Sequence, residues 1–274
     1  MAYKRILTVQ DISCLGQCSM TVALPILSAC GHETCILPTA LLSTHTGGFG
    51  RPSVVHMDDV LEQMAAHWRE NDITFDAILV GYLGSVSAIE TAARILDTML
   101  APGGVSIVDP AMADHGRLYS GFDGSYERAM EDLCRKADII LPNITEAAMM
   151  SGNVYREDLT EDYVTKLLDD LKHPGVILTG VGYRAGETGI VIREGERQQH
   201  YVHSRIGKSY HGTGDMFAAA FSGALMQDKS RYDAVKIAAD FVCRCIENTA
   251  ANPAHWYGVK FETALPDLIR MLGL

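Results

Sequence analysis

Two glycines and an acidic residue stand together in His211-Gly212-Thr213-Gly214-Asp215, directly before a run of small and apolar residues. Glycines let successive backbone N–H groups point to one spot, and the start of a helix adds partial positive charge. Gly212, Thr213 and Gly214 are therefore candidates for binding an anion such as a phosphate. Asp215 would lie beside that anion, where a general base for a substrate hydroxyl is needed. Its plainer interpretation is an acidic residue in the first turn of a helix.

Two other phosphate-binding motifs do not fit this sequence. A P-loop requires GxxxxGK[ST], and Gly207-Lys208-Ser209 supplies its end, but Val202 occupies the place of the first glycine. A dinucleotide fingerprint requires GxGxxG before a helix, whereas Gly180 and Gly182 are followed by Gly186 and a predicted hairpin. Segment 211–215 is therefore the candidate anion site.

The elements that must position these residues follow from the alternation of short aliphatic runs with longer amphipathic segments. This pattern predicts an α/β fold with a parallel sheet and crossover helices. The predicted strands are Arg5–Val9, Thr34–Leu37, Phe75–Val80, Val105–Val108, Ile139–Leu141 and Val176–Leu178, with an edge hairpin of Gly189–Arg193 and Gln198–His203. The predicted helices include Asp58–Glu70, Val86–Leu100, Asp215–Gln227, Arg231–Thr249 and Phe261–Leu272. No repeat or linker interrupts the pattern, so we expect one domain over residues 1–274.

Polar and glycine residues follow most of the predicted strands. Ligands of open α/β sheets bind beyond the carboxyl ends of the strands. The residues at these ends are Asp11, Gly81–Tyr82, Asp109–Pro110, Pro142–Asn143 and Thr179–Gly180. Although turns also favour such residues, the sequence predicts that they line one site.

Composition limits the possible partners. The chain has 274 residues, of which 47% are hydrophobic and 21% charged, so it can bury a substantial core. Its net charge of −11 repels polyanions, and we expect neither nucleic acid nor an anionic membrane as a partner. Seven cysteines in a chain of this length indicate reduced thiols rather than a disulfide framework. Without an apolar run that could span a membrane or act as a signal peptide, a cytoplasmic protein is expected.

The Gly-Thr-Gly-Asp segment resembles the hallmark of ribokinase-like kinases, and Asn143-Ile144-Thr145-Glu146 resembles their NxxE element. Within that superfamily the sequence is most similar to the pyridoxal (vitamin B6) kinases. The supporting stretches are Val9-Gln10-Asp11, Thr44-His45-Thr46-Gly47, Gly81-Tyr82, Val108-Asp109-Pro110 with Asp114, and Leu141-Pro142-Asn143 through Ser151-Gly152. The resemblance covers nearly the whole chain. It implies a three-layer α/β/α fold around a mostly parallel sheet, and a homodimer.

The resemblance also implies ATP as phosphoryl donor and Mg²⁺ bridging its phosphates, and it leaves a monovalent cation open. Asp109 and Glu146 would hold the metal, directly or through water. Asp215 would accept the proton of the substrate's 5′-hydroxymethyl group. The residues implied on the nucleotide side are Asn143, Thr179, Gly180, Lys208, Gly212 and Gly214, although Lys208 could equally be a solvated surface lysine.

By the same resemblance, Asp11, His45, Thr46 and Tyr82 would surround a pyridine ring. Related kinases usually carry serine at the place of Asp11, and a carboxylate there would favour a protonated ring or indicate another heterocycle. His45 could instead be a hydrogen-bonded loop residue, and Tyr82 a core aromatic. Residues 112–123 would form a lid.

Three other functions compete with a pyridoxal kinase. Hydroxymethylpyrimidine kinase of thiamine synthesis acts on another small ring that carries a hydroxymethyl group. A ribokinase-like sugar or nucleoside kinase would carry a small lid sheet after the first strands, and no such insertion is evident before Asp58. A non-catalytic sensor of vitamin B6 or nucleotide should lack the base or the metal carboxylates, yet Asp215, Asp109 and Glu146 are all present.

Overall fold

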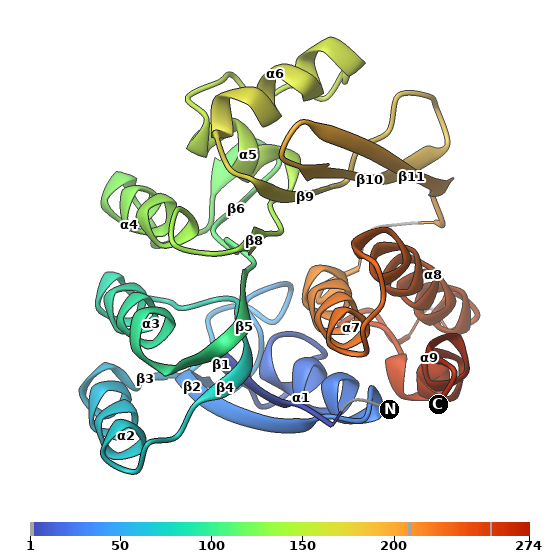
Figure 1. The fold of residues 1–274 in the computed structure, drawn as a ribbon. Helices are drawn as coiled ribbons and strands as arrows, with labels where there is room; N and C mark the ends of the chain where they lie inside the picture. The colour runs from blue at the N-terminus through green and yellow to red at the C-terminus, as the bar shows by residue number, and fades with distance from the viewer. Residues whose placement is uncertain (1–2, 208–209, 253) are drawn as a thin grey trace.

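A nine-stranded sheet of mostly parallel strands forms the centre of the protein (Figure 1). The computed structural model describes residues 3–207, 210–252 and 254–274. The strand order is β11-β10-β9-β8-β5-β4-β1-β2-β3; the strands from β9 to β2 in this order are parallel, and β3, β10 and β11 pair antiparallel at the two edges. The strands are β1 (Arg5–Ser13), β2 (Glu33–Leu42), β3 (Val54–His56), β4 (Phe75–Val80), β5 (Leu100–Val108), β8 (Ile139–Ile140), β9 (Gly175–Thr179), β10 (Glu187–Glu194) and β11 (Arg197–Ser204), while β6 (Ala113–Asp114) and β7 (Arg117–Leu118) form a separate hairpin.

Helices cover both faces of the sheet. On one face lie α2 (Asp58–Glu70), α3 (Val86–Met99), α4 (Gly124–Cys134), α5 (Ile144–Met150) and α6 (Glu161–Leu171); on the other lie α1 (Met20–Ala29), α7 (Thr213–Met226), α8 (Arg231–Ala250), the 3₁₀ turn η1 (Phe261–Ala264) and α9 (Leu265–Leu272) (Figure 1). The expected three-layer α/β/α fold is thereby confirmed. In the part of the chain that the structure describes, no helix is long and apolar enough to cross a membrane.

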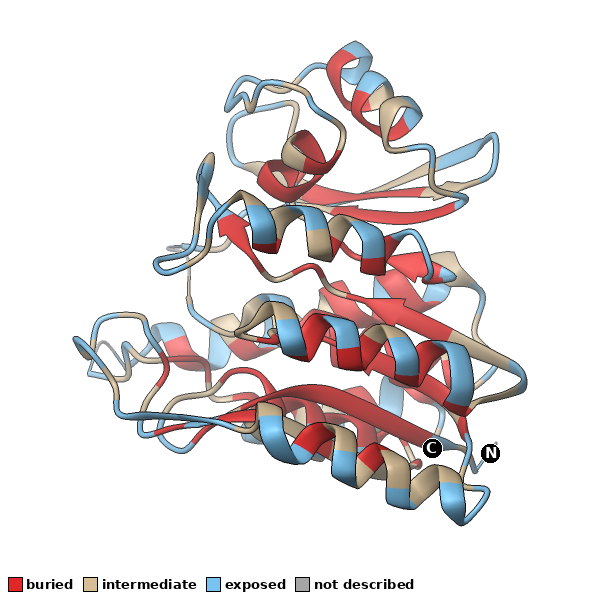
Figure 2. Cartoon of the chain, turned by 90° about the vertical axis from the view of Figure 1, so that its left-hand side faces the viewer, coloured by how far each residue is buried: buried red, intermediate tan, exposed pale blue. Residues whose placement is uncertain are grey.

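The two helix layers pack on two separate hydrophobic cores. Successive residues of a strand point to opposite faces, and β4 shows this plainly. Ile78 and Val80 enter the core beneath α2 to α6, whereas Ala77 and Leu79 enter the core beneath α1 and α7 to α9. Seen from the side of α2, α3 and α4, the helices expose one flank while the strands behind them are buried (Figure 2). Burial on both faces explains why the strands appear in the sequence as continuous aliphatic runs.

Most predicted elements correspond to observed ones, with two instructive differences. Helix α1 was not predicted, because it is apolar around most of its surface and contains Pro25, so it lacks the periodicity of an amphipathic helix. The single helix predicted over Phe261–Leu272 is instead η1 followed by α9, with Pro266 in the first turn of α9.

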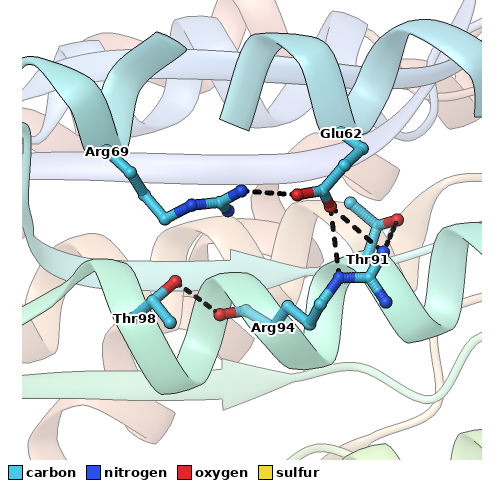
Figure 3. A network of polar contacts seen from close by, with 5 residues as sticks. All are labelled: Glu62, Arg69, Thr91, Arg94 and Thr98. Carbon is cyan, nitrogen blue, oxygen red and sulfur yellow. Dashed lines mark hydrogen bonds and ion pairs between the residues drawn. The ribbon is translucent and has the colours of Figure 1, made fainter. Parts of the chain in front are cut away.

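A polar network joins α2 to α3 (Figure 3). Glu62 on α2 accepts hydrogen bonds from Arg69 on the same helix and from Arg94 on α3, whose Nη2 lies 3.0 Å from Glu62 Oε2. Arg94 Nη2 also donates to Thr91 Oγ1, and the Thr98 hydroxyl donates to the Arg94 carbonyl. Because these side chains are partly exposed, each ion pair contributes about 0–1 kcal/mol. The network therefore links the two helices but adds little to the stability of the fold.

The sheet brings the predicted strand ends side by side. Backbone hydrogen bonds of 2.8–3.0 Å link each end to the next: Gly81 N–H to Val9 O, Asp109 N–H to Val80 O, Leu141 N–H to Val108 O, and Thr179 N–H to Pro142 O. The carboxyl ends of β1, β4, β5, β8 and β9 therefore form one continuous edge. The candidate functional residues lie along it.

Candidate active site

The candidate anion site lies at the start of α7. Gly212 caps this helix with a φ of 78°, a left-handed conformation that favours glycine. A Cβ at Gly212 would lie 1.8 Å from the Gln17 carbonyl oxygen, so the loop before α1 touches the start of α7 here. By contrast, a Cβ at Gly214 would meet, among the described residues, no atom within 4 Å outside its own helix turn. The helix start, whose first N–H groups have no carbonyl partner within the helix, is therefore uncovered at Gly214.

Asp215 lies in the first turn of α7, beside this opening. Burial raises the pKa of its carboxyl from 3.8 to about 6, with a smaller contribution from the Asp11 carboxylate. The Ser19 backbone nearby opposes that rise in pKa. A carboxyl with a pKa of about 6 is mostly ionised at pH 7, yet it is a stronger base than an exposed aspartate. These properties suit the predicted general base.

Asp11 lies within β1 and not after it, which corrects the expected end of this strand. The strand continues to Ser13, and its register with β2 shifts between Gln10 and Ile12. Such an irregularity redirects a side chain at the end of a sheet. The buried Asp11 carboxylate accepts a hydrogen bond from Ser13 Oγ, at 3.0 Å from Oδ2. Burial nonetheless raises the pKa of Asp11.

Ser19 is a residue of the site that sequence reasoning missed. Its φ of 49° and ψ of −131° place it in a region that residues other than glycine rarely adopt, at a cost of about 1–3 kcal/mol. It lies near both carboxylates and lowers the pKa of Asp11 and of Asp215. No local pattern marks a serine in this conformation, because the contacts come from β1 and α7.

Glu146 joins α5 to residues 112–123. Its Oε1 accepts hydrogen bonds from the backbone N–H groups of Met112 and Ala113, and its Oε2 accepts one from Asn143 at 2.9 Å. Asn143 Oδ1 in turn accepts the Glu146 N–H, which completes a capping box. Burial raises the pKa of Glu146 to about 8 despite these donors. With both oxygens engaged, Glu146 is suited to contact a metal through water.

Asp109 differs from Glu146 in having no hydrogen-bond donor among the described residues. Burial and the charges of Glu146 and Asp215 raise its pKa well above the ordinary range. The described residues contain no group of three or more His, Cys, Asp or Glu side chains arranged to hold a metal by themselves. A carboxylate without a donor, repelled by its neighbours, does fit Mg²⁺, which takes one or two carboxylates together with phosphate oxygens and water.

Replacing Asp109 with asparagine should stabilise the metal-free protein at high pH. The folded-state pKa of Asp109 is raised, so its contribution to stability is present at low pH and is lost as the pH rises. Thermal unfolding without Mg²⁺ should therefore show a higher melting temperature for Asp109→Asn than for the wild type at pH 8, and little difference at pH 4. Added Mg²⁺ and nucleotide should raise the melting temperature of the wild type more than that of the variant.

Asp138→Asn is the matched control for this experiment, since the Asp138 carboxylate accepts hydrogen bonds from both the N–H and the hydroxyl of Ser106. It should lower the melting temperature modestly, because the two hydrogen bonds from Ser106 to Asp138 Oδ2 lose their charged acceptor. A lower melting temperature of Asp109→Asn at pH 8 without Mg²⁺ would show that Asp109 is a structural carboxylate.

His45 is held by the backbone through both ring nitrogens. Nε2 lies 2.8 Å from the Tyr257 carbonyl oxygen, and Nδ1 accepts the Gly47 N–H at 3.0 Å. The interpretation of His45 as a hydrogen-bonded loop residue therefore holds for its two ring nitrogens. A substrate can contact only the ring carbons. Thr46 beside it is exposed. Contact of either residue with a substrate stays a prediction.

Tyr82 belongs to a row of aromatic rings that reaches residues 112–123. Its half-buried ring stacks on Phe122 with centroids 5.5 Å apart, and Phe122 stacks on Tyr126 at 3.6 Å. Burial, and then the Asp11 carboxylate, raises the pKa of Tyr82 to about 12. Tyr82 and Asp11 are thus close enough to interact, and Phe122 places the expected lid segment against them.

Some of the residues expected to bind the nucleotide use their side chains in contacts within the protein, whereas Gly180 is open to a ligand. The Thr179 hydroxyl donates to the Pro142 carbonyl oxygen at 3.3 Å, and the Asn143 side chain is used by the capping box. Gly180 has a φ of 78° and would have open space around a Cβ, as expected for a surface that a ligand approaches. Lys208 lies outside the described residues. Binding of nucleotide by these residues stays a prediction.

Comparisons with known proteins agree with this geometry. The family model for phosphomethylpyrimidine kinase matches residues 24–259. The crystal structure of pyridoxal kinase from Lactobacillus plantarum has a TM-score of 0.90 and 33% identity, covering 98% of this chain and 97% of that chain. A Bacteroides thetaiotaomicron protein, provisionally described as a phosphomethylpyrimidine kinase and crystallised with pyridoxal, has a TM-score of 0.89 and 32% identity over 97% of this chain and 96% of that chain. The hydroxymethylpyrimidine/phosphomethylpyrimidine kinase of Bacillus subtilis is 30% identical over 183 residues, 65% of this chain and 66% of its own length.

Proposed function

This chain is a ribokinase-like kinase of the pyridoxal and phosphomethylpyrimidine kinase family, and we propose that it phosphorylates the 5′-hydroxymethyl group of pyridoxal, pyridoxine or pyridoxamine with ATP. The observation that carries this proposal is the start of α7. There an uncovered glycine, Gly214, precedes Asp215, a buried carboxyl whose pKa is raised to about 6. An anion-binding helix start next to a poised base is what transfer of a phosphoryl group to a hydroxyl requires.

In this mechanism the oxygen of the hydroxymethyl group attacks the γ-phosphorus of ATP while Asp215 accepts its proton, and the bond from the γ-phosphorus to the bridging oxygen breaks to release ADP. The backbone N–H groups at Gly212–Gly214 stabilise the charge on the group in transfer, and one preorganised donor of this kind contributes roughly 3–4 kcal/mol. Asp109, and Glu146 through water, would hold Mg²⁺, which would neutralise the phosphate charge. Asn143, Thr179, Gly180 and Lys208 would face the nucleotide.

The proposed ring site is formed by Asp11, Tyr82 and the carbon edge of His45, with Thr46 at its rim. A pyridine nitrogen that meets the Asp11 carboxylate is stabilised in its protonated form, because an opposite charge favours the charged state. Support for a vitamin B6 substrate comes from the Lactobacillus plantarum pyridoxal kinase and from the Bacteroides thetaiotaomicron protein crystallised with pyridoxal, both of which match nearly the whole chain.

Hydroxymethylpyrimidine kinase is the second candidate function. It is favoured by the family model and by the Bacillus subtilis relative. Its aminopyrimidine ring also offers a basic nitrogen to Asp11. The same base, Asp215, and the same anion site would serve both substrates, so the choice between them depends on the ring site.

A coupled assay of ADP release tests the proposal. The purified protein would be given ATP, Mg²⁺ and, in turn, pyridoxal, pyridoxine, pyridoxamine, hydroxymethylpyrimidine and ribose. We expect the three vitamers to stimulate ADP release most, with hydroxymethylpyrimidine weaker and ribose inactive. Stimulation by hydroxymethylpyrimidine alone would establish the second candidate, and stimulation by ribose alone would exclude both.

We also propose a single kinase domain over residues 1–274, a homodimer and a cytoplasmic location, on the strength of the family. Light scattering coupled to size exclusion would measure the dimer. Repeating the assay with and without K⁺ would show whether a monovalent cation is needed.

A further inference from the structure

Gln17, in the loop between β1 and α1, contacts two separate parts of the molecule. Its backbone touches the start of α7, and its side chain is hydrogen-bonded to residues 255–262, between α8 and α9. We infer that Gln17 is a positioning residue, which holds the wall of the ring site at a fixed place relative to the anion site. The inference rests on the proposed function, since it assigns the two ends of this connection to the ring and to the phosphate.

Both ends of the Gln17 amide are engaged by residues 255–262. Nε2 donates to the two carboxylate oxygens of Glu262, at 2.9 and 3.0 Å. Because a carboxylate only accepts hydrogen bonds, this contact fixes the orientation of the amide and leaves Oε1 as the acceptor for His255 Nε2, 2.6 Å away. A Cβ at Gly258 would lie 2.7 Å from Gln17 Cβ, so the backbone of this segment also packs on the side chain.

The backbone of Gln17 packs on the anion site. A Cβ at Gly212 would lie 1.8 Å from the Gln17 carbonyl oxygen and 2.9 Å from its carbon, so the two segments approach as closely as glycine permits. Gly212 caps α7 and belongs to the proposed phosphate site. The position of Gln17 is therefore fixed relative to the start of α7.

The segment bonded to Gln17 in turn holds loop 44–50, which carries residues of the proposed ring site. His45 Nε2 lies 2.8 Å from the Tyr257 carbonyl oxygen. The Phe49 ring lies against the Trp256 ring, with centroids 4.6 Å apart. The loop is thus attached to this segment by a hydrogen bond and by a ring contact.

This connection matters for phosphoryl transfer because the attacking oxygen must lie about 3–3.5 Å from the phosphorus. The ring site sets the place of the hydroxymethyl group, and the start of α7 sets the place of the γ-phosphate. Gln17 joins the two through residues 255–262. Loss of its amide should therefore misplace one substrate against the other without removing a group that touches either.

An exchange of the two partners tests this role. Gln17→Ala removes the amide and Gln17→Glu places a carboxylate against Glu262, so each should lower kcat/KM for the ring substrate about tenfold. In Gln17→Glu/Glu262→Gln the amide and the carboxylate have changed places, and the contacts with residue 262 and with His255 can form again. We expect this double variant, and Glu262→Gln alone, to stay within about threefold of the wild type.

ATP binding and an unrelated hydrogen bond are the controls. The Kd of ATP should stay within about twofold in every variant, because the proposed nucleotide residues Asn143 and Gly180 follow β8 and β9, which β5 and β4 separate from β1. Asn248→Ala removes a 2.9 Å hydrogen bond to Thr263 Oγ1, which joins α8 to η1. It should lower the melting temperature about as much as Gln17→Ala does and leave kcat/KM unchanged. A kcat/KM within twofold of the wild type in Gln17→Ala, or no recovery in the double variant, would overturn the inference.

Fluorescence of Trp256 separates this inference from the proposed function, because it needs no substrate. The chain has two tryptophans, so Trp68→Phe leaves Trp256 as the single one. In this background, Gln17→Ala should make acrylamide quenching about twofold stronger, since the Trp256 ring loses its fixed place against Phe49. The exchanged pair should restore the original quenching, and Asn248→Ala should not change it. Unchanged quenching in Gln17→Ala overturns the positioning role even if pyridoxal is phosphorylated, and the predicted pattern supports that role even if it is not.

Discussion

Asp215→Asn should lower kcat by at least about a hundredfold while leaving the binding of ATP within about twofold of the wild type. The asparagine amide is nearly isosteric with the carboxylate, so the start of α7 should keep its geometry. It cannot take the proton of the attacking hydroxyl. Steady-state ADP release and calorimetric titration with ATP measure the two quantities.

The pH dependence and a matched variant sharpen this test. Because the pKa of Asp215 is about 6, kcat/KM of the wild type should fall tenfold per unit of pH below that value, as the base becomes protonated. Asp233 also lies in the first turn of a helix, α8, where it accepts the Ser230 hydroxyl. Asp233→Asn should leave kcat unchanged. Near-normal turnover in Asp215→Asn would show that Asp215 is not the general base.

Gly214→Ala should lower phosphoryl transfer at least about a hundredfold without destabilising the protein. A helix favours alanine over glycine by about 1 kcal/mol, and in the part of the chain that the structure describes a Cβ at this position meets no atom within 4 Å outside its own helix turn. The fold therefore gives no reason for glycine here, whereas a phosphate close to the backbone does. Loss of a preorganised contact of this kind costs roughly 3–4 kcal/mol of transition-state stabilisation. The melting temperature tests the expected stability of this variant. The value of kcat/KM, measured on the same preparation, tests the expected loss of phosphoryl transfer.

Gly212→Ala provides the contrast two residues earlier. Its Cβ would lie 1.8 Å from the Gln17 carbonyl oxygen, and its φ of 78° disfavours alanine, so this variant should lose stability as well as activity. If Gly214→Ala has the activity of the wild type, the open space above α7 is not a phosphate site.

The sequence predicted those parts of the site that local chemistry determines. Gly212 and Asp215 lie at the start of α7, where the sequence predicted the start of a helix, and their role beside an anion stays a prediction. Asp109 and Asn143 follow aliphatic strands whose burial on both faces was evident, and the parallel sheet places both at one edge. The sequence prediction thus named residues that lie at the start of α7 and at the end of β5.

Contacts between distant segments could not be predicted. The irregularity that keeps Asp11 within β1 depends on pairing with β2, and the strain at Ser19 depends on α7 and β1 together. Glu146 was identified, but its engagement by backbone donors from residues 112–123 arises only when α5 meets that segment. These three features depend on which distant segments pack together in the fold, and the residue types of the local sequence do not reveal them.

The net charge of −11 does not conflict with binding of ATP, because the proposed site uses backbone N–H groups, a helix start and Mg²⁺ in place of a basic cluster. Part of the acidic excess is then functional, in Asp109, Glu146 and Asp215.

Identification of the product tests the central claim most directly. Wild-type protein would be incubated with ATP, Mg²⁺ and an equimolar mixture of pyridoxal and hydroxymethylpyrimidine, and the products would be resolved by mass spectrometry and ³¹P NMR. We predict that pyridoxal gains a single phosphoryl group on its 5′-oxygen before hydroxymethylpyrimidine is consumed, and that Asp215→Asn forms neither product at a comparable rate. Phosphorylation of hydroxymethylpyrimidine with pyridoxal left intact would contradict the proposed substrate, and pyridoxal phosphorylation by Asp215→Asn at the wild-type rate would contradict the mechanism.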